Sequence, residues 1–200
     1  MSETKESKEP SGETGSALAR YMGGRYWVVN VPLRAGQTIS SLSMAQEMIA
    51  QLNGRPRVPA NTTIYRWIGG REILHADNKE YGKKRPGDFR TGGICRDKAF
   101  MSASKLQSYI ENAIASSLKT QHVFEIITCE NSQARDVASF RNNTAEAELI
   151  FPPDVKFHIV SKGNKKYGKK SARVWYLQEL AEGRNAGGGS SAGIDIGSLD

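Results

Sequence analysis

Two glutamates two residues apart, Glu146 and Glu148, stand before an apolar run that ends in two prolines. Side chains two apart on a β-strand point to the same face, so a strand here would place both carboxylates together. Neighbouring carboxylates repel each other, which costs stability unless a cation or a substrate uses them. Taken alone, the pair is better explained as the acidic solvent face of a strand.

Two further segments bear groups that could act with these carboxylates. Arg66 closes the apolar segment Ile64-Tyr65-Arg66, and Ser102 and Ser104 lie in the segment 100–104. A guanidinium is planar and permanently charged, which suits it to binding phosphate. With the arginine and the serines in place, an acidic solvent face becomes the weaker explanation of the glutamate pair.

In this order, the three segments resemble the signature of arginine-directed mono-ADP-ribosyltransferases. Residues 100–104 match the family's Phe-x-Ser-Thr-Ser segment, except that Ala103 stands where threonine is usual. Residues 145–153 resemble its Glu-x-Glu strand with an apolar run and a closing proline, and the likeness extends from about Tyr65 to Val160. The resemblance implies a transferase that splits NAD, as co-substrate, and passes ADP-ribose to an arginine of a target protein.

The resemblance also assigns roles at the NAD site. Glu148 would accept a hydrogen bond from the ribose 2′-hydroxyl and stabilise the positive charge that develops on the ribose. Ser102 would hold Glu148 and the nicotinamide ribose, Ser104 would support the same strand, and Arg66 would pair with an NAD phosphate. Trp67 is expected beside them, where many relatives have glycine, which would change the backbone contact with nicotinamide.

The same comparison makes Glu146 the residue that selects the acceptor. A carboxylate there can pair with an arginine and take its proton, whereas relatives that modify other side chains commonly carry glutamine. The preceding loop, Val137 to Ala145, is expected to touch the protein substrate. Phe140 is its candidate contact residue, although a role in the core explains this aromatic almost as well.

The chain is long enough for one compact domain, with 200 residues and 38% hydrophobic residues. Residues 1–24 are polar and glycine-containing, which predicts disorder and is compatible with a secretion signal. Residues 182–200 are rich in glycine and serine and predict a flexible tail. The catalytic domain is therefore expected over residues 25–181.

The elements expected in this domain indicate an α+β fold, an ADP-ribosyltransferase-like arrangement of helices packed on a mainly antiparallel, sandwich-like β core. The apolar spacing from Ser40 to Leu52 predicts a helix, and a second helix is expected from about Tyr109 to Leu118. Strands are expected at residues 26–31, 62–68, 100–104, 123–129, 147–151, 155–160 and 173–177.

The net charge of +7 concentrates in two similar stretches, Tyr81–Arg85 and Tyr167–Lys170. Solvated basic loops explain them most simply, and a patch for nucleic acid, an acidic protein or an approaching dinucleotide is the alternative. Two other functions therefore stay open. One is an NAD glycohydrolase or an inactive relative on the same fold, and the other is a basic nucleic-acid-binding module.

No metal site is predicted, because Cys95, Cys129 and the histidines His75, His122 and His158 show no ligand spacing. A disulfide between the two cysteines is the less favoured role, since both lie in apolar stretches. No apolar run reaches the ~20 residues of a membrane helix, and the start lacks the core of a signal peptide. We expect a soluble chain made in the cytoplasm, then secreted or injected into a host cell as an effector toxin, or a phage-type enzyme.

Overall fold

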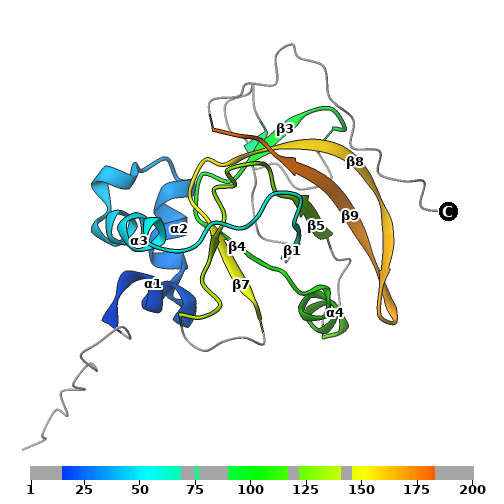
Figure 1. Ribbon diagram of the computed structural model, residues 1–200, viewed down its shortest axis with the longest axis horizontal. Coiled ribbons are helices and arrows are strands. Elements are labelled where there is room, and N and C mark those ends of the chain that lie inside the picture. The colour runs from blue at the N-terminus through cyan, green and yellow to red at the C-terminus, as the bar shows by residue number, and fades with distance from the viewer. Residues whose placement is uncertain (1–14, 69–74, 77–89, 117–121, 141–145, 183–200) are drawn as a thin grey trace, which may run out of the picture.

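The computed structural model describes residues 15–68, 75–76, 90–116, 122–140 and 146–182. Helical elements form two groups, one before the first strand and one between β4 and β5 (Figure 1). They are α1 (Ala17–Arg20), the π-helical turn η2 (Tyr21–Arg25), α2 (Trp27–Arg34), the 3₁₀ turn η3 (Ile39–Ser41), α3 (Ser43–Asn53) and α4 (Gln107–Ala115).

Within the described residues, the strands form one nine-stranded sheet in the order β2-β3-β8-β9-β5-β1-β4-β7-β6. Its pairs are antiparallel except for β5 with β9. The α+β class and the mainly antiparallel sheet are therefore confirmed. The strands are β1 (Thr63–Ile68), β2 (His75–Ala76), β3 (Ile94–Arg96), β4 (Met101–Ser104), β5 (His122–Ile127), β6 (Arg135–Asp136), β7 (Glu148–Phe151), β8 (Lys156–Tyr167) and β9 (Lys170–Glu179).

The helices before β1 pack as a layer against the end of the sheet that carries β4 and β7 (Figure 1). Phe100 and Ile150 of the sheet share one apolar cluster with Leu18, Leu33 and Met48 of these helices. The helix predicted at residues 40–52 is confirmed as α3, which ends at Asn53 with Gly54 as its C-cap. This N-terminal helical layer packs against the strands β4 and β7 that carry part of the candidate site.

The strand predicted at residues 26–31 is wrong, because this segment lies in helix α2 and the turn before it. Its aromatic and β-branched composition favours a strand locally, but the packing surface is helical. Val29, Asn30 and Leu33 are buried at helical spacing, whereas Trp27 and Val31 are 60% and 61% exposed. Tertiary contacts therefore decide the conformation of this segment.

Packed structure also begins earlier than the residue 25 expected for the domain. Ala17, Leu18 and Ala19 are fully buried in helix α1. The first backbone N–H groups of α1 donate to side chains of α3, from Ala17 to Glu47 Oε1 at 2.9 Å and from Leu18 to Gln51 Oε1 at 2.9 Å. These partners are about thirty residues away in the chain, so local sequence gives no sign of them. The disorder expected for residues 1–14 lies outside the described residues, as does nearly all of the tail.

The second basic stretch, Tyr167–Lys170, forms the exposed turn of a hairpin, between the end of β8 and the start of β9. β8 extends seven residues past the predicted end at Val160, and a turn at Gly168, with φ +57°, leads into β9. The first basic stretch, residues 81–85, lies outside the described residues. Both cysteines are free, and no described helix is long and apolar enough to cross a membrane.

Candidate active site

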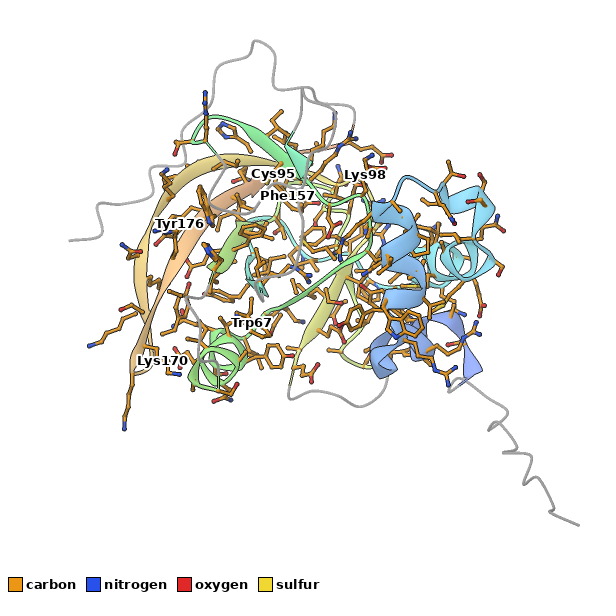
Figure 2. The ribbon with its side chains drawn as sticks, turned by 180° about the vertical axis from the view of Figure 1, so that it is seen from behind. Trp67, Cys95, Lys98, Phe157, Lys170 and Tyr176 are labelled. Carbon is orange, nitrogen blue, oxygen red and sulfur yellow. The ribbon has the colours of Figure 1, made fainter. Side chains whose placement is uncertain are left out.

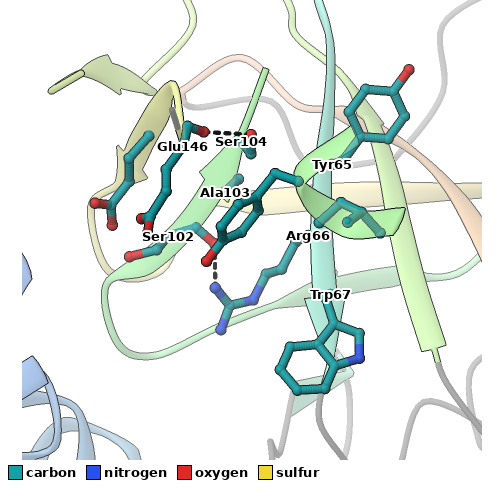
Figure 3. Close-up of a pocket in the computed structure, with 10 residues that line it drawn as sticks. Tyr65, Arg66, Trp67, Ser102, Ala103, Ser104 and Glu146 are labelled. Carbon is teal, nitrogen blue, oxygen red and sulfur yellow. Dashed lines mark hydrogen bonds between the residues drawn. The ribbon is translucent and has the colours of Figure 1, made fainter. Parts of the chain in front are cut away.

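A pocket of about 110 Å³ lies where β1, β4, β7 and α4 meet (Figure 3). Every predicted site residue except Phe140 lines it. Its lining consists of Tyr65, Arg66, Trp67, Ser102, Ala103, Ser104, Tyr109, Ile110, Glu146 and Glu148. A whole dinucleotide is far larger than this volume, so the pocket can hold only the reacting end of such a ligand.

Strand pairing brings the three signature segments together. β4 lies between β1 and β7 in the sheet, with Tyr65 opposite Ser104 and Ser104 opposite Glu148. Arg66 is therefore carried on the strand on one side of the serines and Glu148 on the strand on the other. Two antiparallel strand pairs thus bring the three motifs, which are far apart in the chain, together in space.

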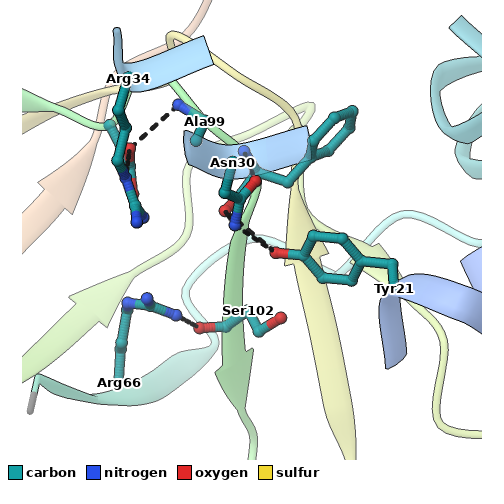
Figure 4. A network of polar contacts seen from close by, with 8 residues as sticks. Tyr21, Asn30, Arg34, Arg66, Ala99 and Ser102 are labelled. Carbon is teal, nitrogen blue, oxygen red and sulfur yellow. Dashed lines mark hydrogen bonds and ion pairs between the residues drawn. The ribbon is translucent and has the colours of Figure 1, made fainter. Parts of the chain in front are cut away.

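Arg66 is almost completely buried beside the serine strand. Its exposed fraction is 9%, because the alternation of β1 places it on the same side as the buried Ile64 and Ile68. Its Nη1 donates a hydrogen bond to the carbonyl oxygen of Ser102 (Figures 3 and 4). A buried guanidinium needs such acceptors to offset its lost hydration, and this one also fixes the direction of the charge.

Glu148 is the most strongly perturbed acid of the site. Burial raises its pKa, the hydrogen bond with the Ser102 side chain and the charge of Arg66 lower it, and Glu146 raises it, so that the pKa lies at about 7. A carboxyl group poised near neutral pH in a pocket is typical of a functional site. The side chain of Ser102 is thus in hydrogen-bond contact with Glu148.

Glu146 does not share a strand face with Glu148, which corrects the expected geometry. β7 begins at Glu148, and Glu146 lies in the preceding turn, where Ala147 has a φ of 42°. The hydroxyl of Ser104 donates to the backbone carbonyl of Glu146 at 2.6 Å and accepts from the N–H of Leu106 at 2.9 Å. Ser104 therefore anchors the turn that aims Glu146 into the pocket.

Phe140 is placed in the core and not at the pocket. Its partly buried ring packs against the apolar cluster of the helical layer, and the guanidinium of Arg55 lies 4.4 Å from the ring centroid. Trp67 lines the pocket and also packs on the apolar cluster formed with α4 (Figure 2). The rest of the predicted substrate loop, residues 141–145, lies outside the described residues.

Sequence reasoning missed a polar network that joins the helical layer to β4 (Figure 4). The Asn30 side chain accepts from the N–H of Phe100 and donates to its carbonyl, both at 3.1 Å. Tyr21 donates to the same carbonyl at 3.1 Å and forms a hydrogen bond with the Ser102 side chain. Burial raises the pKa of Tyr21 to about 12, so its hydroxyl keeps its proton. An asparagine inside an apolar run was the only available signal.

Sequence reasoning also missed Tyr109, which lines the pocket, and Arg34, which belongs to the neighbouring polar network. Tyr109 of α4 lines the pocket with 39% of its surface exposed, and its pKa is raised by burial and by the charges of Glu146 and Glu148. Arg34 of α2 extends from the helical layer into the network of Figure 4. Asp97, only 2% exposed, fixes Arg34 by two hydrogen bonds of 3.0 and 2.6 Å.

The arrangement offers two carboxylates, a tyrosine and a buried arginine around a small chamber. Among the described residues, no group of three His, Cys, Asp or Glu side chains could hold a metal ion. The chemistry that these groups can perform themselves is stabilisation of a developing cation and transfer of a proton.

Comparison with known proteins identifies a family whose model matches most of the chain. The family model for the ADP-ribosyltransferase exoenzyme domain matches residues 1–178. No curated protein matches the chain in sequence.

Solved structures share the fold at low sequence identity. The Vis toxin, an ADP-ribosyltransferase from Vibrio splendidus, is 19% identical with a TM-score of 0.58, over 86% of this chain and 75% of its own. Exoenzyme S from Pseudomonas aeruginosa, solved with human 14-3-3 protein beta and carba-NAD, is 18% identical with a TM-score of 0.57, over 90% and 78%. The C2-I component of the Clostridium botulinum C2 toxin is 19% identical with a TM-score of 0.59, over 85% of this chain and 44% of that one.

Proposed function

The chain belongs to the ADP-ribosyltransferase exoenzyme family, and we propose that it cleaves NAD and transfers the ADP-ribose to an arginine of a target protein. The observation that carries the proposal is the convergence of Arg66, Ser102, Glu146 and Glu148 on one pocket. NAD enters as a co-substrate and no metal takes part.

Glu148 is proposed to stabilise the positive charge that develops on the ribose during the reaction. Breaking the bond between nicotinamide and ribose leaves positive charge on the ribose ring, as in other glycosyl transfers. In the ground state the positive charge lies on nicotinamide, and it moves to the ribose as neutral nicotinamide leaves, so an ionised Glu148 beside the ribose stabilises the transition state more than the ground state. Ser102, hydrogen-bonded to Glu148, holds the carboxylate in position for this role.

Arg66 is proposed to bind an NAD phosphate, together with Arg34. Both guanidiniums belong to the network of Figure 4, one from the sheet and one from the helical layer. Asp97 and the Ser102 carbonyl orient them. Preoriented guanidiniums bind phosphates in a forked geometry that a lysine ammonium cannot reproduce.

Glu146 and Tyr109 are proposed to receive the acceptor arginine. A carboxylate can pair with a guanidinium and take its proton as the new bond to ribose forms. The partly exposed ring of Tyr109 lies on the same pocket, and aromatic faces attract guanidinium groups. An acidic group and a ring at one chamber therefore suit a cationic acceptor better than a neutral one.

Glu146→Gln tests this assignment by separating transfer from NAD cleavage. The variant keeps the size of the side chain but cannot take a proton, so ADP-ribosylation of agmatine, a small guanidinium acceptor, should fall by about 100-fold. Nicotinamide release into water should continue, because Glu148 is unchanged. Nicotinamide and ADP-ribosyl-agmatine are measured in the same reactions, with Glu130→Gln on the exposed surface as the control.

Three results would contradict the proposal in different ways. Unchanged agmatine labelling by Glu146→Gln would remove Glu146 as the acceptor residue. A wild-type enzyme that releases nicotinamide without labelling agmatine or any protein would be an NAD glycohydrolase. A chain that neither binds nor cleaves NAD would be an inactive relative.

The location of the target is part of the proposal. The family's exoenzyme name and the toxins with the same fold support a protein that acts in another cell after secretion or injection. Mass spectrometry of ADP-ribosylated peptides from a host lysate incubated with the enzyme and NAD would identify the modified arginine.

A further inference from the structure

The hairpin of β8 and β9 has two unlike faces beyond the bulge at Ile159/Ser161. One face is apolar and packs on Ile110 and Ile114 of α4, through Tyr167, Ala172 and Val174. The pairs Asn164↔Arg173 and Lys166↔Ser171 lie on the opposite face. We name this opposite face the outer hairpin face, and its exposed residues are Lys162, Asn164, Lys166, Ser171 and Arg173.

The outer hairpin face is uniformly basic. Three of its five residues are cations, and the exposed Lys169 follows at the turn. Lys170 pairs with Tyr167 of the inner face and donates to the carbonyl oxygen of Ala115 in α4 at 2.7 Å (Figure 2). The nearby carboxylate of Glu125 is used on the inner face, where Lys165 and Tyr167 both bond to it at 2.6 Å. Within the described part of the chain, Lys166 and Arg173 form no ion pair. Lysines on an edge strand also discourage aggregation, but that role requires neither the arginine nor the hollow described next.

A hollow of about 280 Å³ opens on this face, lined by Lys162, Gly163, Asn164, Arg173 and Trp175. The indole of Trp175 is 1% exposed and forms its floor. The ammonium of Lys162 lies 5.5 Å from the centroid of that ring, which holds the cation beside the hollow. A guanidinium, an ammonium and a side-chain amide around one hollow are donors that suit a carboxylate.

We propose that the outer hairpin face docks an acidic segment of the protein that this enzyme modifies, an inference that rests on the proposed function. Lys162 and Lys166 are four residues apart on β8, and Arg173 on β9 lies between them, opposite Asn164. Alternate residues on a strand are about 6.6 Å apart, so an extended segment with acids at alternate positions matches the advance of these cations along the hairpin. Single-stranded nucleic acid fits less well, because its bases stack on exposed aromatic rings, and the Trp175 ring is buried.

Helix α4 lies between the hairpin and the reaction pocket. It packs on the inner side of the hairpin and supplies Tyr109 and Ile110 to the pocket. The hairpin and the pocket therefore flank one helix, whose diameter with side chains is about 10 Å. A protein that presents an arginine at Glu146 can then reach the hairpin with a neighbouring acidic segment.

The test measures peptide binding without NAD, so that it does not depend on the reaction. The probe is a fluorescein-labelled peptide of alternating glutamate and serine, followed by fluorescence anisotropy. Lys166→Glu combined with Arg173→Glu should weaken binding by about tenfold or more, a loss of about 1.4 kcal/mol. Arg25→Glu combined with Arg90→Glu changes the net charge equally at exposed sites elsewhere and should leave binding nearly unchanged. Agmatine labelling should be normal in both variants, which shows that they fold.

An equal loss of peptide binding in both double variants, or no loss in the hairpin variant, would overturn the proposal. An oligouridine that binds more tightly than the peptide, and loses binding in the hairpin variant, would overturn it in favour of nucleic acid. Peptide binding that behaves as expected in an enzyme that labels no agmatine would contradict the proposed function alone and leave the acidic docking face in place.

Discussion

Strand β4 is held in two different ways by the two regions that flank it. On the sheet side, β1 and β7 pair with it through backbone ladders, and each neighbour supplies a residue that lines the pocket, Arg66 or Glu148. On the helical side, Asn30 and Tyr21 hold the strand at Phe100 by side-chain hydrogen bonds. The sheet side thus places the residues to which the proposed mechanism gives the chemistry, whereas the helical side positions the strand that both sheet neighbours share.

The difference predicts unequal effects of mutation. A change on the sheet side should remove catalysis or NAD binding without lowering the stability of the fold. A change at Asn30 or Tyr21 on the helical side should lower stability and leave much of the chemistry, because neither contacts the reacting ribose in the proposed mechanism.

The largest effect is expected for Glu148→Ala. The ribose cation loses its main stabilising charge, so nicotinamide release and agmatine labelling should both fall by at least ~100-fold. Initial rates at saturating NAD measure this loss, and circular dichroism confirms the fold. Normal nicotinamide release by Glu148→Ala would contradict the whole mechanism.

Catalytic efficiency should also depend on pH, through the ionisation of Glu148. Glu148 has a pKa of about 7, above its usual 4.5, so kcat/KM for NAD should fall about tenfold per pH unit below that value as the carboxylate takes up a proton.

Between pH 4.5 and 7 the folded protein holds a proton that the unfolded chain releases, so Glu148 lowers stability as pH rises through this window. Glu148→Gln should therefore be more stable than wild type by about 1–3 kcal/mol at high pH, and no more stable at low pH. Denaturant melts at both ends of the window check the sign.

Arg66→Lys should weaken NAD binding by about tenfold, because a point charge loses the forked geometry of the guanidinium. The measurement is calorimetric titration with a non-hydrolysable NAD analogue. Arg57→Lys, at a surface arginine bonded to backbone carbonyls near Ser132, is the matched control. An unchanged affinity in Arg66→Lys would make Arg66 a structural residue of β1.

The sequence predicted the sheet side better than the helical side, for a physical reason. Motif spacing and strand alternation are local, so Arg66, Ser102 and Glu148 could be assigned to strands that pair. The helix at residues 27–34 could not be predicted, because Asn30 finds its partner at Phe100, seventy residues away. The same distance hid α1, whose backbone donors bond to Glu47 and Gln51. The turn at Ala147 likewise depends on Ser104 and not on its neighbours in the chain.

The smallest effect on activity is expected on the helical side, for Asn30→Ala. Its side chain is 3% exposed and bonds to both backbone groups of Phe100. Removing it leaves the buried N–H of Phe100 without that acceptor, which should lower the free energy of unfolding by about 1–3 kcal/mol. The ladders with β1 and β7 remain, so kcat should fall by no more than about threefold, or less than 1 kcal/mol of transition-state stabilisation.

Tyr21→Phe separates the two functions of this network. It keeps the ring in the core but removes the hydroxyl that bonds to Phe100 and Ser102. Because Ser102 holds Glu148, this variant should lower kcat more than Asn30→Ala does, while its loss of stability should be smaller, since Asn30 still bonds to Phe100. Chemical denaturation and nicotinamide release, measured on both variants, give the comparison. If Asn30→Ala instead lost activity as severely as Glu148→Ala while remaining folded, the helical side would take part in the chemistry, and the division between the two sides of β4 would be wrong.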